Sequence, residues 1–273
     1  MKKKPYVCGM NKDLGQNWIL LRGLARESEH WGGAFVPLLQ STFPEAKITT
    51  LDLPGTGYFY QDTSPNTIKE ITSQLRQHAF DNGFIQQPIT ILALSLGAMV
   101  AWEWMRRYPE DISAGILINT SFADLSPFYH RLRWQNYKKL LGLIMASNIH
   151  TREARILQLV SNCSDGNNKM GQAWEKIQNA RPISFKNCWR QIKAAATYRP
   201  GNIKPIQSVF LLNSLGDRLV APICSEAISK KWSFEIQLHP WAGHDLPLDD
   251  SDWVVSQLKI WVNKTRINES LLE

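Results

Sequence analysis

Short apolar runs alternate along this chain with longer stretches in which apolar residues recur every three or four positions. Residues 89–94 form an unbroken apolar run, which is typical of a strand buried on both faces of a parallel sheet. Helical spacing follows over 97–105 and stops before Pro109, which cannot continue a helix. Further strands are expected at 18–21, 48–53, 114–119, 209–213 and 234–238, and further helices at 31–39, 67–79 and 251–262. This alternation predicts an α/β protein with a mainly parallel central sheet and helices on both faces.

Residues 124–200 interrupt the alternation, because their pattern is helical throughout. Helical stretches are expected at 132–145, 152–160, 170–180 and 185–198, with polar loops between them. A helical insertion of this length between two sheet strands is typical of a lid. We therefore predict a core made of residues 1–123 and 201–273, with an all-helical cap (residues 124–200) inserted before the strand at 209–213.

Composition places few further limits on the function. The 273 residues are 44% hydrophobic and 20% charged, as in an ordinary soluble domain. The sequence predicts no transmembrane segment and no signal peptide, so we expect a cytoplasmic protein. Its cysteines show no metal-binding spacing, and we expect free thiols and no metal site. These cysteines are Cys8, Cys163, Cys188 and Cys224.

The expected strand at 89–94 ends in the pentapeptide Ala93-Leu94-Ser95-Leu96-Gly97. A serine at a strand-to-helix turn is held in a strained conformation with its hydroxyl outward, and the residues two before and two after it must be small. This arrangement is the nucleophile elbow of serine hydrolases. The pentapeptide alone is equally compatible with a turn that merely contains a serine, so the rest of the chain must decide.

A serine nucleophile needs a base, an acid that orients the base, and N–H donors for the oxyanion. In parallel sheets these groups gather at the carboxyl ends of the strands. Asp217 and His244 each follow an expected strand, and the chain order Ser95, Asp217, His244 is that of nucleophile-elbow hydrolases. The backbone N–H groups of Leu24 and Leu96 would bind the oxyanion.

Two other residues are weaker alternatives for these roles. Asp124 follows the strand after the elbow, where some members of this fold place their acid, and His239 lies close to His244 in the sequence. Three more carboxylates near the start of the last helix are predicted to be solvated charges. They are Asp245, Asp249 and Asp250.

Five short motifs occur in order along the chain: Arg22-Gly23, Leu51-Asp-Leu-Pro-Gly-Thr-Gly57, Ala93-Leu-Ser-Leu-Gly97, Gly216-Asp-Arg-Leu-Val220 and Gly243-His-Asp-Leu-Pro247. Over nearly its whole length the chain therefore resembles α/β-hydrolases of the cap-bearing serine esterase and lipase group. It departs from their pattern at two positions. Arg22 stands where the family usually has histidine, and Ala93 stands where glycine is commoner.

The resemblance implies a serine hydrolase that cleaves a carboxylic ester or thioester through an acyl-enzyme on Ser95, without a cofactor. A non-catalytic binding protein on the same fold is the alternative, suggested by Arg22 and Ala93. The complete Ser, Asp and His set favours the enzyme, because a decayed site usually loses one of the three. A haloalkane dehalogenase is excluded, since it would need a carboxylate at position 95.

Basic residues are concentrated in the predicted cap. Residues 131–199 contain thirteen Lys and Arg against three acids, a net charge of +10, whereas the whole chain carries +7. A solvated surface would explain this excess. It would equally attract an anionic partner such as an acyl carrier protein, a coenzyme A thioester or an anionic lipid headgroup. The cap is similar to that of carboxylesterases acting on a methyl ester carried by acyl carrier protein. Nucleic acid is not expected, because no binding module is recognisable.

Overall fold

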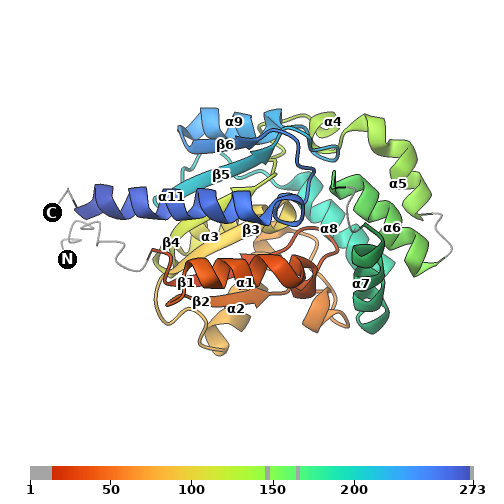
Figure 1. Ribbon diagram of the computed structural model, residues 1–273, viewed down its shortest axis with the longest axis horizontal. Helices are drawn as coiled ribbons and strands as arrows, with labels where there is room; N and C mark the ends of the chain where they lie inside the picture. The colour runs from red at the N-terminus through yellow and green to blue at the C-terminus, as the bar shows by residue number, and fades with distance from the viewer. Residues whose placement is uncertain (1–13, 145–147, 164–166, 271–273) are drawn as a thin grey trace.

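The computed structural model describes residues 14–144, 148–163 and 167–270. Within them, six strands form one wholly parallel sheet in the order β2-β1-β3-β4-β5-β6 (Figure 1). The strands are β1 (Asn17–Leu21), β2 (Lys47–Leu51), β3 (Ile89–Leu94), β4 (Ile112–Ile118), β5 (Ser208–Ser214) and β6 (Glu235–His239). The predicted fold class is confirmed, and each strand end lies within two residues of its predicted position.

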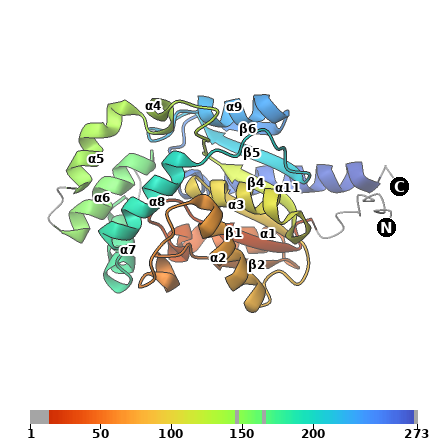
Figure 2. The ribbon, with the colours of Figure 1, turned by 180° about the vertical axis from the view of Figure 1, so that it is seen from behind.

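Helices cover both faces of the sheet (Figures 1 and 2). They are α1 (Gly32–Thr42) and α11 (Ser251–Ser270) on one face, and α2 (Ile68–Asp81), α3 (Leu96–Arg107) and α9 (Ile223–Trp232) on the other. A separate apolar cluster lies under each group. Of these helices, α9 was not among the predicted elements. It buries Cys224, Ile228 and Trp232, which recur every four residues.

The predicted start of α2 is present in atomic detail. Thr67 Oγ1 accepts a hydrogen bond from the N–H of Glu70 at 3.2 Å and donates to Glu70 Oε2 at 2.8 Å, so the two residues form the start of the helix together. The face of α2 that the apolar spacing predicts is buried. It consists of Ile68, Ile71, Leu75 and Ala79.

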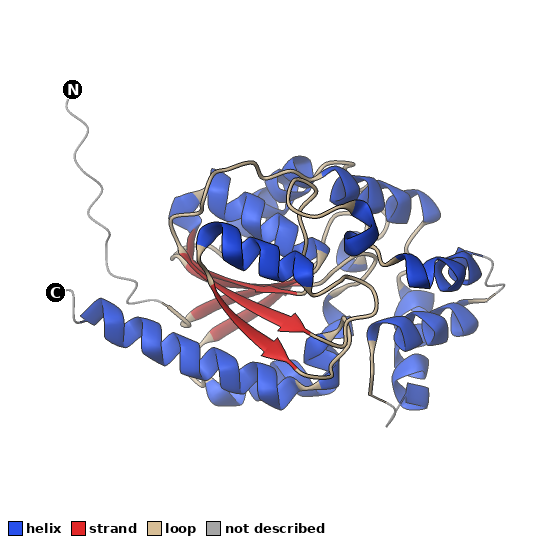
Figure 3. Cartoon of the chain, turned by 90° about the horizontal axis from the view of Figure 1, so that it is seen from above, coloured by secondary structure: helices blue, strands red, loops and turns tan. Residues whose placement is uncertain are grey.

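In the described residues, five α-helices lie between β4 and β5 in the sequence: α4 (Phe128–Arg131), α5 (Tyr137–Ile144), α6 (Ile149–Val160), α7 (Asn167–Ala180) and α8 (Phe185–Thr197). They gather beyond the end of the sheet to which the strand arrows point (Figures 1 and 3). This end carries the predicted site residues that follow β3, β5 and β6. The inserted helices are therefore on the side of the sheet where a lid would act.

Two expected absences concern the membrane and the cysteines. None of the helices in the described residues is both long and apolar enough to cross a bilayer. Cys163, Cys188 and Cys224 form no disulfide bond with one another, and Cys8 lies outside the described residues.

The indole of Trp102 stands at the centre of the core between β4, α3 and α9. It is fully buried, and its ring centroid lies 4.9 Å from that of Phe122 and 4.5 Å from that of Trp232. Because the neighbouring rings cannot collapse fully into the space, we expect Trp102→Ala to lower the free energy of unfolding by about 3–5 kcal/mol. Urea titration followed by far-UV circular dichroism would measure this loss.

Trp189→Ala is the matched control for this prediction. Trp189 lies on α8 and is 61% exposed, so its removal should change the free energy of unfolding by no more than about 0.5 kcal/mol. Equal losses in the two variants would contradict the assignment of Trp102 to the core.

Candidate active site

Ser95 occupies the sharp turn between β3 and α3. Its backbone has φ 56° and ψ −115°, a combination that side-chain-bearing residues rarely adopt. Two contacts from the next strand hold it in place: its N–H donates to the carbonyl of Ile118 at 2.9 Å, and its carbonyl accepts from Thr120 Oγ1 at 2.9 Å. The turn has the strained geometry that the pentapeptide predicts for a nucleophile elbow.

The residue two positions after Ser95 has no room for a side chain. A Cβ at Gly97 would lie 2.5 Å from the carbonyl oxygen of Arg22 and 2.8 Å from that of Leu21. A Cβ at Gly23 would lie 3.2 Å from that of Ser95, so the end of β1 passes directly beside the serine. Small residues are required here because two backbone segments meet at van der Waals distance.

This close approach brings the predicted oxyanion donors to the two sides of the serine. Leu24 follows Gly23 on the β1 side, and Leu96 is the first residue of α3. Within the described residues, the N–H groups of Leu24 and Leu96 donate to no protein acceptor. Both remain available for a bound ligand, as oxyanion donors must be.

His244 and Asp217 meet at the ends of two neighbouring strands. His244 Nδ1 lies 2.7 Å from Asp217 Oδ2, and both side chains are buried. The second carboxylate oxygen of Asp217 accepts the N–H groups of Leu219 at 2.7 Å and Val220 at 2.9 Å. With its carboxylate fixed in this way, Asp217 orients the imidazole through Nδ1 and leaves Nε2 for another partner.

The two alternative residues have other partners. Asp124 Oδ2 accepts the N–H of Gly201 at 2.9 Å. His239 Nε2 lies 3.1 Å from Asp250 Oδ2, and its Nδ1 accepts the N–H of Ala242 at 2.9 Å. Among the described residues, Asp217 rather than Asp124 contacts His244, and the buried His239 supports the turn after β6.

Asn119 is a residue of the site that the sequence analysis missed. It is fully buried with φ 47°, and its Nδ2 donates to the carbonyl of His244 at 2.8 Å and to Ser214 Oγ at 3.0 Å. Its Oδ1 accepts the N–H of Ser214 at 2.8 Å. The side chain therefore joins the ends of β4 and β5 to the backbone of His244. The available signal was an amide directly after the buried run of β4, but that pattern does not identify the partners.

The prediction that Asp245 is a solvated charge is wrong. Asp245 is 2% exposed and forms a two-pronged ion pair with Arg22, which is equally buried. Arg22 Nη1 lies 3.1 Å from Asp245 Oδ1, Nη2 contacts Oδ2, and the guanidinium lies over the ring of Trp31. No partner for this carboxylate could be predicted from the sequence, because the two residues are 223 positions apart. Arg22 therefore stands at the usual histidine position with a buried counter-charge.

The loop that follows β1 (residues 22–31, the β1 loop) also binds the inserted helices. Arg26 Nη1 lies 2.6 Å from Glu153 Oε2 of α6, and its guanidinium lies over the ring of Trp174 of α7. Arg181 Nε donates to Glu27 Oε2 at 2.9 Å. Some of the basic residues of the predicted cap therefore neutralise carboxylates within the molecule.

Burial alters the titration of the β1 loop. It lowers the pKa of His30 well below its usual value, and the positive charges of Arg26 and Arg22 lower that pKa further. Burial likewise raises the pKa of Glu27, which the hydrogen bond from Arg181 opposes. His30 Nε2 lies 2.9 Å from Arg26 Nη1, so the imidazole packs directly against this arginine.

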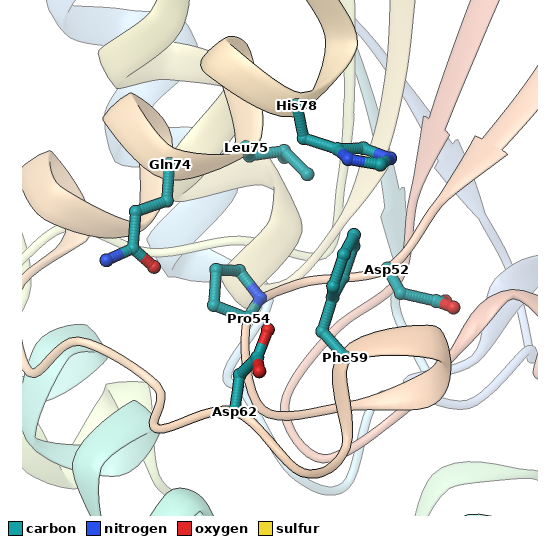
Figure 4. A pocket seen from close by; sticks show the side chains of 7 residues that line it. All are labelled: Asp52, Pro54, Phe59, Asp62, Gln74, Leu75 and His78. Atoms are coloured by element: carbon teal, nitrogen blue, oxygen red, sulfur yellow. The ribbon is translucent and has the colours of Figure 1, made fainter. Parts of the chain in front are cut away.

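A small pocket of about 120 Å³ lies between the loop after β2 and α2 (Figure 4). The rings of Phe59 and His78 meet edge to face in it, with centroids 4.7 Å apart. The side chains that line it are those of Asp52, Pro54, Phe59, Asp62, Gln74, Leu75 and His78. Ser95, Asp217 and His244 are not among them, so this pocket does not define a substrate site.

Comparisons with known proteins identify the family of this chain. The model of the Alpha/beta hydrolase family matches residues 18–257. The chain is 24% identical over 185 residues to the biotin biosynthesis bifunctional protein BioHC of Teredinibacter turnerae. That match covers 63% of this chain but only 30% of the relative, so the chain spans less than a third of the relative's length.

Solved structures with the same fold include three hydrolases. The thermophilic esterase from Thermogutta terrifontis has 18% identity and a TM-score of 0.68, covering 92% of this chain and 90% of that one. The enol-lactonase from Burkholderia xenovorans has 14% identity and a TM-score of 0.69, covering 93% and 94%. The esterase RhEst1 from a Rhodococcus species has 13% identity and a TM-score of 0.72, covering 93% and 92%. At these identities the similarity shows the fold alone.

Removing one partner of the Arg22–Asp245 pair should destabilise the protein strongly. Asp245→Ala leaves a buried guanidinium without its counter-charge, so we expect the free energy of unfolding to fall by about 3–5 kcal/mol. Urea titration would measure the change.

The double variant Arg22→Met/Asp245→Leu is the control. It removes both charges and restores apolar packing, so it should be more stable than Asp245→Ala. If the double variant loses as much free energy of unfolding as the sum of the losses from changing each position alone, the two side chains are not coupled.

Proposed function

The chain belongs to the alpha/beta hydrolase family, and we propose that it is a serine hydrolase whose catalytic triad is Ser95, His244 and Asp217. The observation that carries this proposal is the 2.7 Å contact between His244 Nδ1 and Asp217 Oδ2. The strained turn at Ser95 supports it from the nucleophile's side. Asn119 and Thr120 are consecutive residues that bind the backbones of His244 and Ser95, so the base and the nucleophile are held by one short segment.

In this mechanism Ser95 Oγ attacks the acyl carbon of the substrate while His244 Nε2 takes its proton. The N–H groups of Leu24 and Leu96 stabilise the negative charge on the tetrahedral oxygen. His244 then protonates the leaving group, which departs and leaves an acyl-enzyme on Ser95. Water attacks this ester with His244 again as the base, which releases the acid and restores the serine. Asp217 stays ionised throughout and holds the imidazole in the required tautomer.

The proposed substrates are carboxylic esters or thioesters, including acyl groups carried by an acyl carrier protein or coenzyme A. The excess positive charge of the inserted helices supports the carrier-bound class, because it would attract an anionic carrier. Exposed lysines lie on three of these helices. They are Lys138 and Lys139 on α5, Lys169 and Lys176 on α7, and Lys186 and Lys193 on α8.

The competing interpretation is a binding protein that has lost catalysis. It rested on Arg22 and Ala93, which replace the usual histidine and the commoner glycine. The buried Arg22–Asp245 pair argues against decay, since the arginine has a buried counter-charge and the loop remains beside Ser95. We therefore retain the enzyme as the proposed function.

Ser95→Ala should abolish catalysis while leaving the fold intact. A fluorophosphonate probe should label the wild type and not the variant, because only an activated serine reacts. Turnover of a panel of p-nitrophenyl esters and acyl-coenzyme A thioesters should fall about a thousandfold or more. Labelling at another residue, or none in folded wild-type protein, would refute the proposed nucleophile.

Asp217→Asn and Asp124→Asn should have opposite outcomes. Loss of the Asp217 carboxylate leaves His244 in the wrong tautomer, so we expect turnover to fall about 10³- to 10⁴-fold. Asp124→Asn keeps an acceptor for the N–H of Gly201 and should stay within a few-fold of the wild type. Steady-state hydrolysis of one ester by both variants measures the difference. An inactive Asp124→Asn beside a near-normal Asp217→Asn would reverse the assignment.

A further inference from the structure

Helix α8 is attached to the rest of the molecule through polar side chains. Asn187 is buried, and it accepts the N–H of Ser64 at 2.9 Å and donates to the carbonyl of Asp62 at 2.7 Å. Gln191 is also buried, and its Oε1 accepts the N–H of Ala25 at 3.0 Å. In the first two turns of α8, the side chains that hold the inward face in place are therefore mainly amides.

The outward face of α8 carries large apolar side chains instead. Phe185 is 73% exposed, Trp189 is 61% exposed and Ile192 is 37% exposed. Their spacing of four and three residues aligns them along one stripe, on the side of the helix opposite Asn187 and Gln191. The usual polarity of a surface helix is thus reversed, since the apolar side faces solvent. Apolar side chains gathered on one exposed face indicate an interaction surface.

Positive charge borders this apolar stripe. Lys186 and Lys193 lie two helical turns apart on one flank of α8, and both are exposed. Within the described residues neither forms an ion pair, and α8 contains no acidic residue. The flank therefore presents uncompensated cations beside Phe185, Trp189 and Ile192. This surface therefore combines large apolar side chains, two of them aromatic, with positive charge.

We propose that α8 is a docking helix for an anionic lipid bilayer surface. Phe185, Trp189 and Ile192 would enter the interface between headgroups and acyl chains, and Lys186 and Lys193 would contact the anionic headgroups. An exposed helix with Trp and Phe along one side and lysines on its flank has the composition of interfacial helices. Figure 2 shows α8 on the side of the molecule that faces the viewer.

The alternative occupant is a soluble acidic protein, and the composition of the surface favours the bilayer. Phe185, Trp189 and Ile192 lie along the exposed side of α8 with lysines on its flank, which is the distribution of side chains in interfacial helices. Docking on lipid does not depend on the chemistry proposed for Ser95.

Co-sedimentation with lipid vesicles tests the proposal directly. The wild type should sediment with vesicles of phosphatidylglycerol and phosphatidylcholine at low salt, and should remain in solution with phosphatidylcholine alone. Binding should weaken as salt rises, because the Debye length shortens to about 10 Å at 0.1 M. Phe185→Ser/Trp189→Ser and Lys186→Glu/Lys193→Glu should each lower the partition coefficient about tenfold or more.

Lys259→Glu/Ile260→Ser on α11 is the matched control, since it makes the same kinds of change at exposed positions on another helix. It should bind vesicles like the wild type, as should Ser95→Ala, which separates docking from hydrolysis. Thermal unfolding of all variants would verify that they are folded. Wild-type protein that ignores anionic vesicles, α8 variants that bind normally, or a control that loses binding equally would overturn the proposal. So would saturable binding to purified acyl carrier protein without any vesicle binding.

Discussion

The buried ion pair between Arg22 and Asp245 is the interaction on which the geometry of the site depends. It joins the β1 loop, which carries the Leu24 N–H, to the residue that directly follows His244. Removing two charges from water is unfavourable, and the two-pronged contact together with the ring of Trp31 compensates for it. Because the pair tolerates little displacement, the two loops are held in one relative position.

A second set of contacts fixes the same position from the other side. Asn119 and Thr120 directly follow β4 and bind the backbones of His244 and Ser95. The candidate site is thus held by the Arg22–Asp245 ion pair on one side and by the hydrogen bonds of Asn119 and Thr120 on the other. Such double support explains how Ser95 can hold an unfavourable backbone conformation, since the surrounding structure over-determines it.

The fold could be predicted from the sequence, and so could the position of the candidate site residues at strand ends, because both depend on local patterns. Strands and helices differ in the period of their apolar residues, and Ser95, Asp217 and His244 each follow a strand whose carboxyl end is known from the parallel order. The Arg22–Asp245 pair and the contacts of Asn119 were not predictable in this way. Their partners lie 223, 95 and 125 positions away, and sequence spacing carries no information on which distant residues the topology brings together.

The ion pairs that bind the β1 loop to the insertion limit how independent these parts of the molecule are. Arg26 holds Glu153, and Glu27 holds Arg181, within six residues of Arg22. An insertion without a carboxylate at position 153 and a guanidinium at position 181 would leave a buried arginine and a buried glutamate uncompensated. The β1 loop and the insertion therefore depend on each other's charges, although residues 32–123 separate them in the sequence.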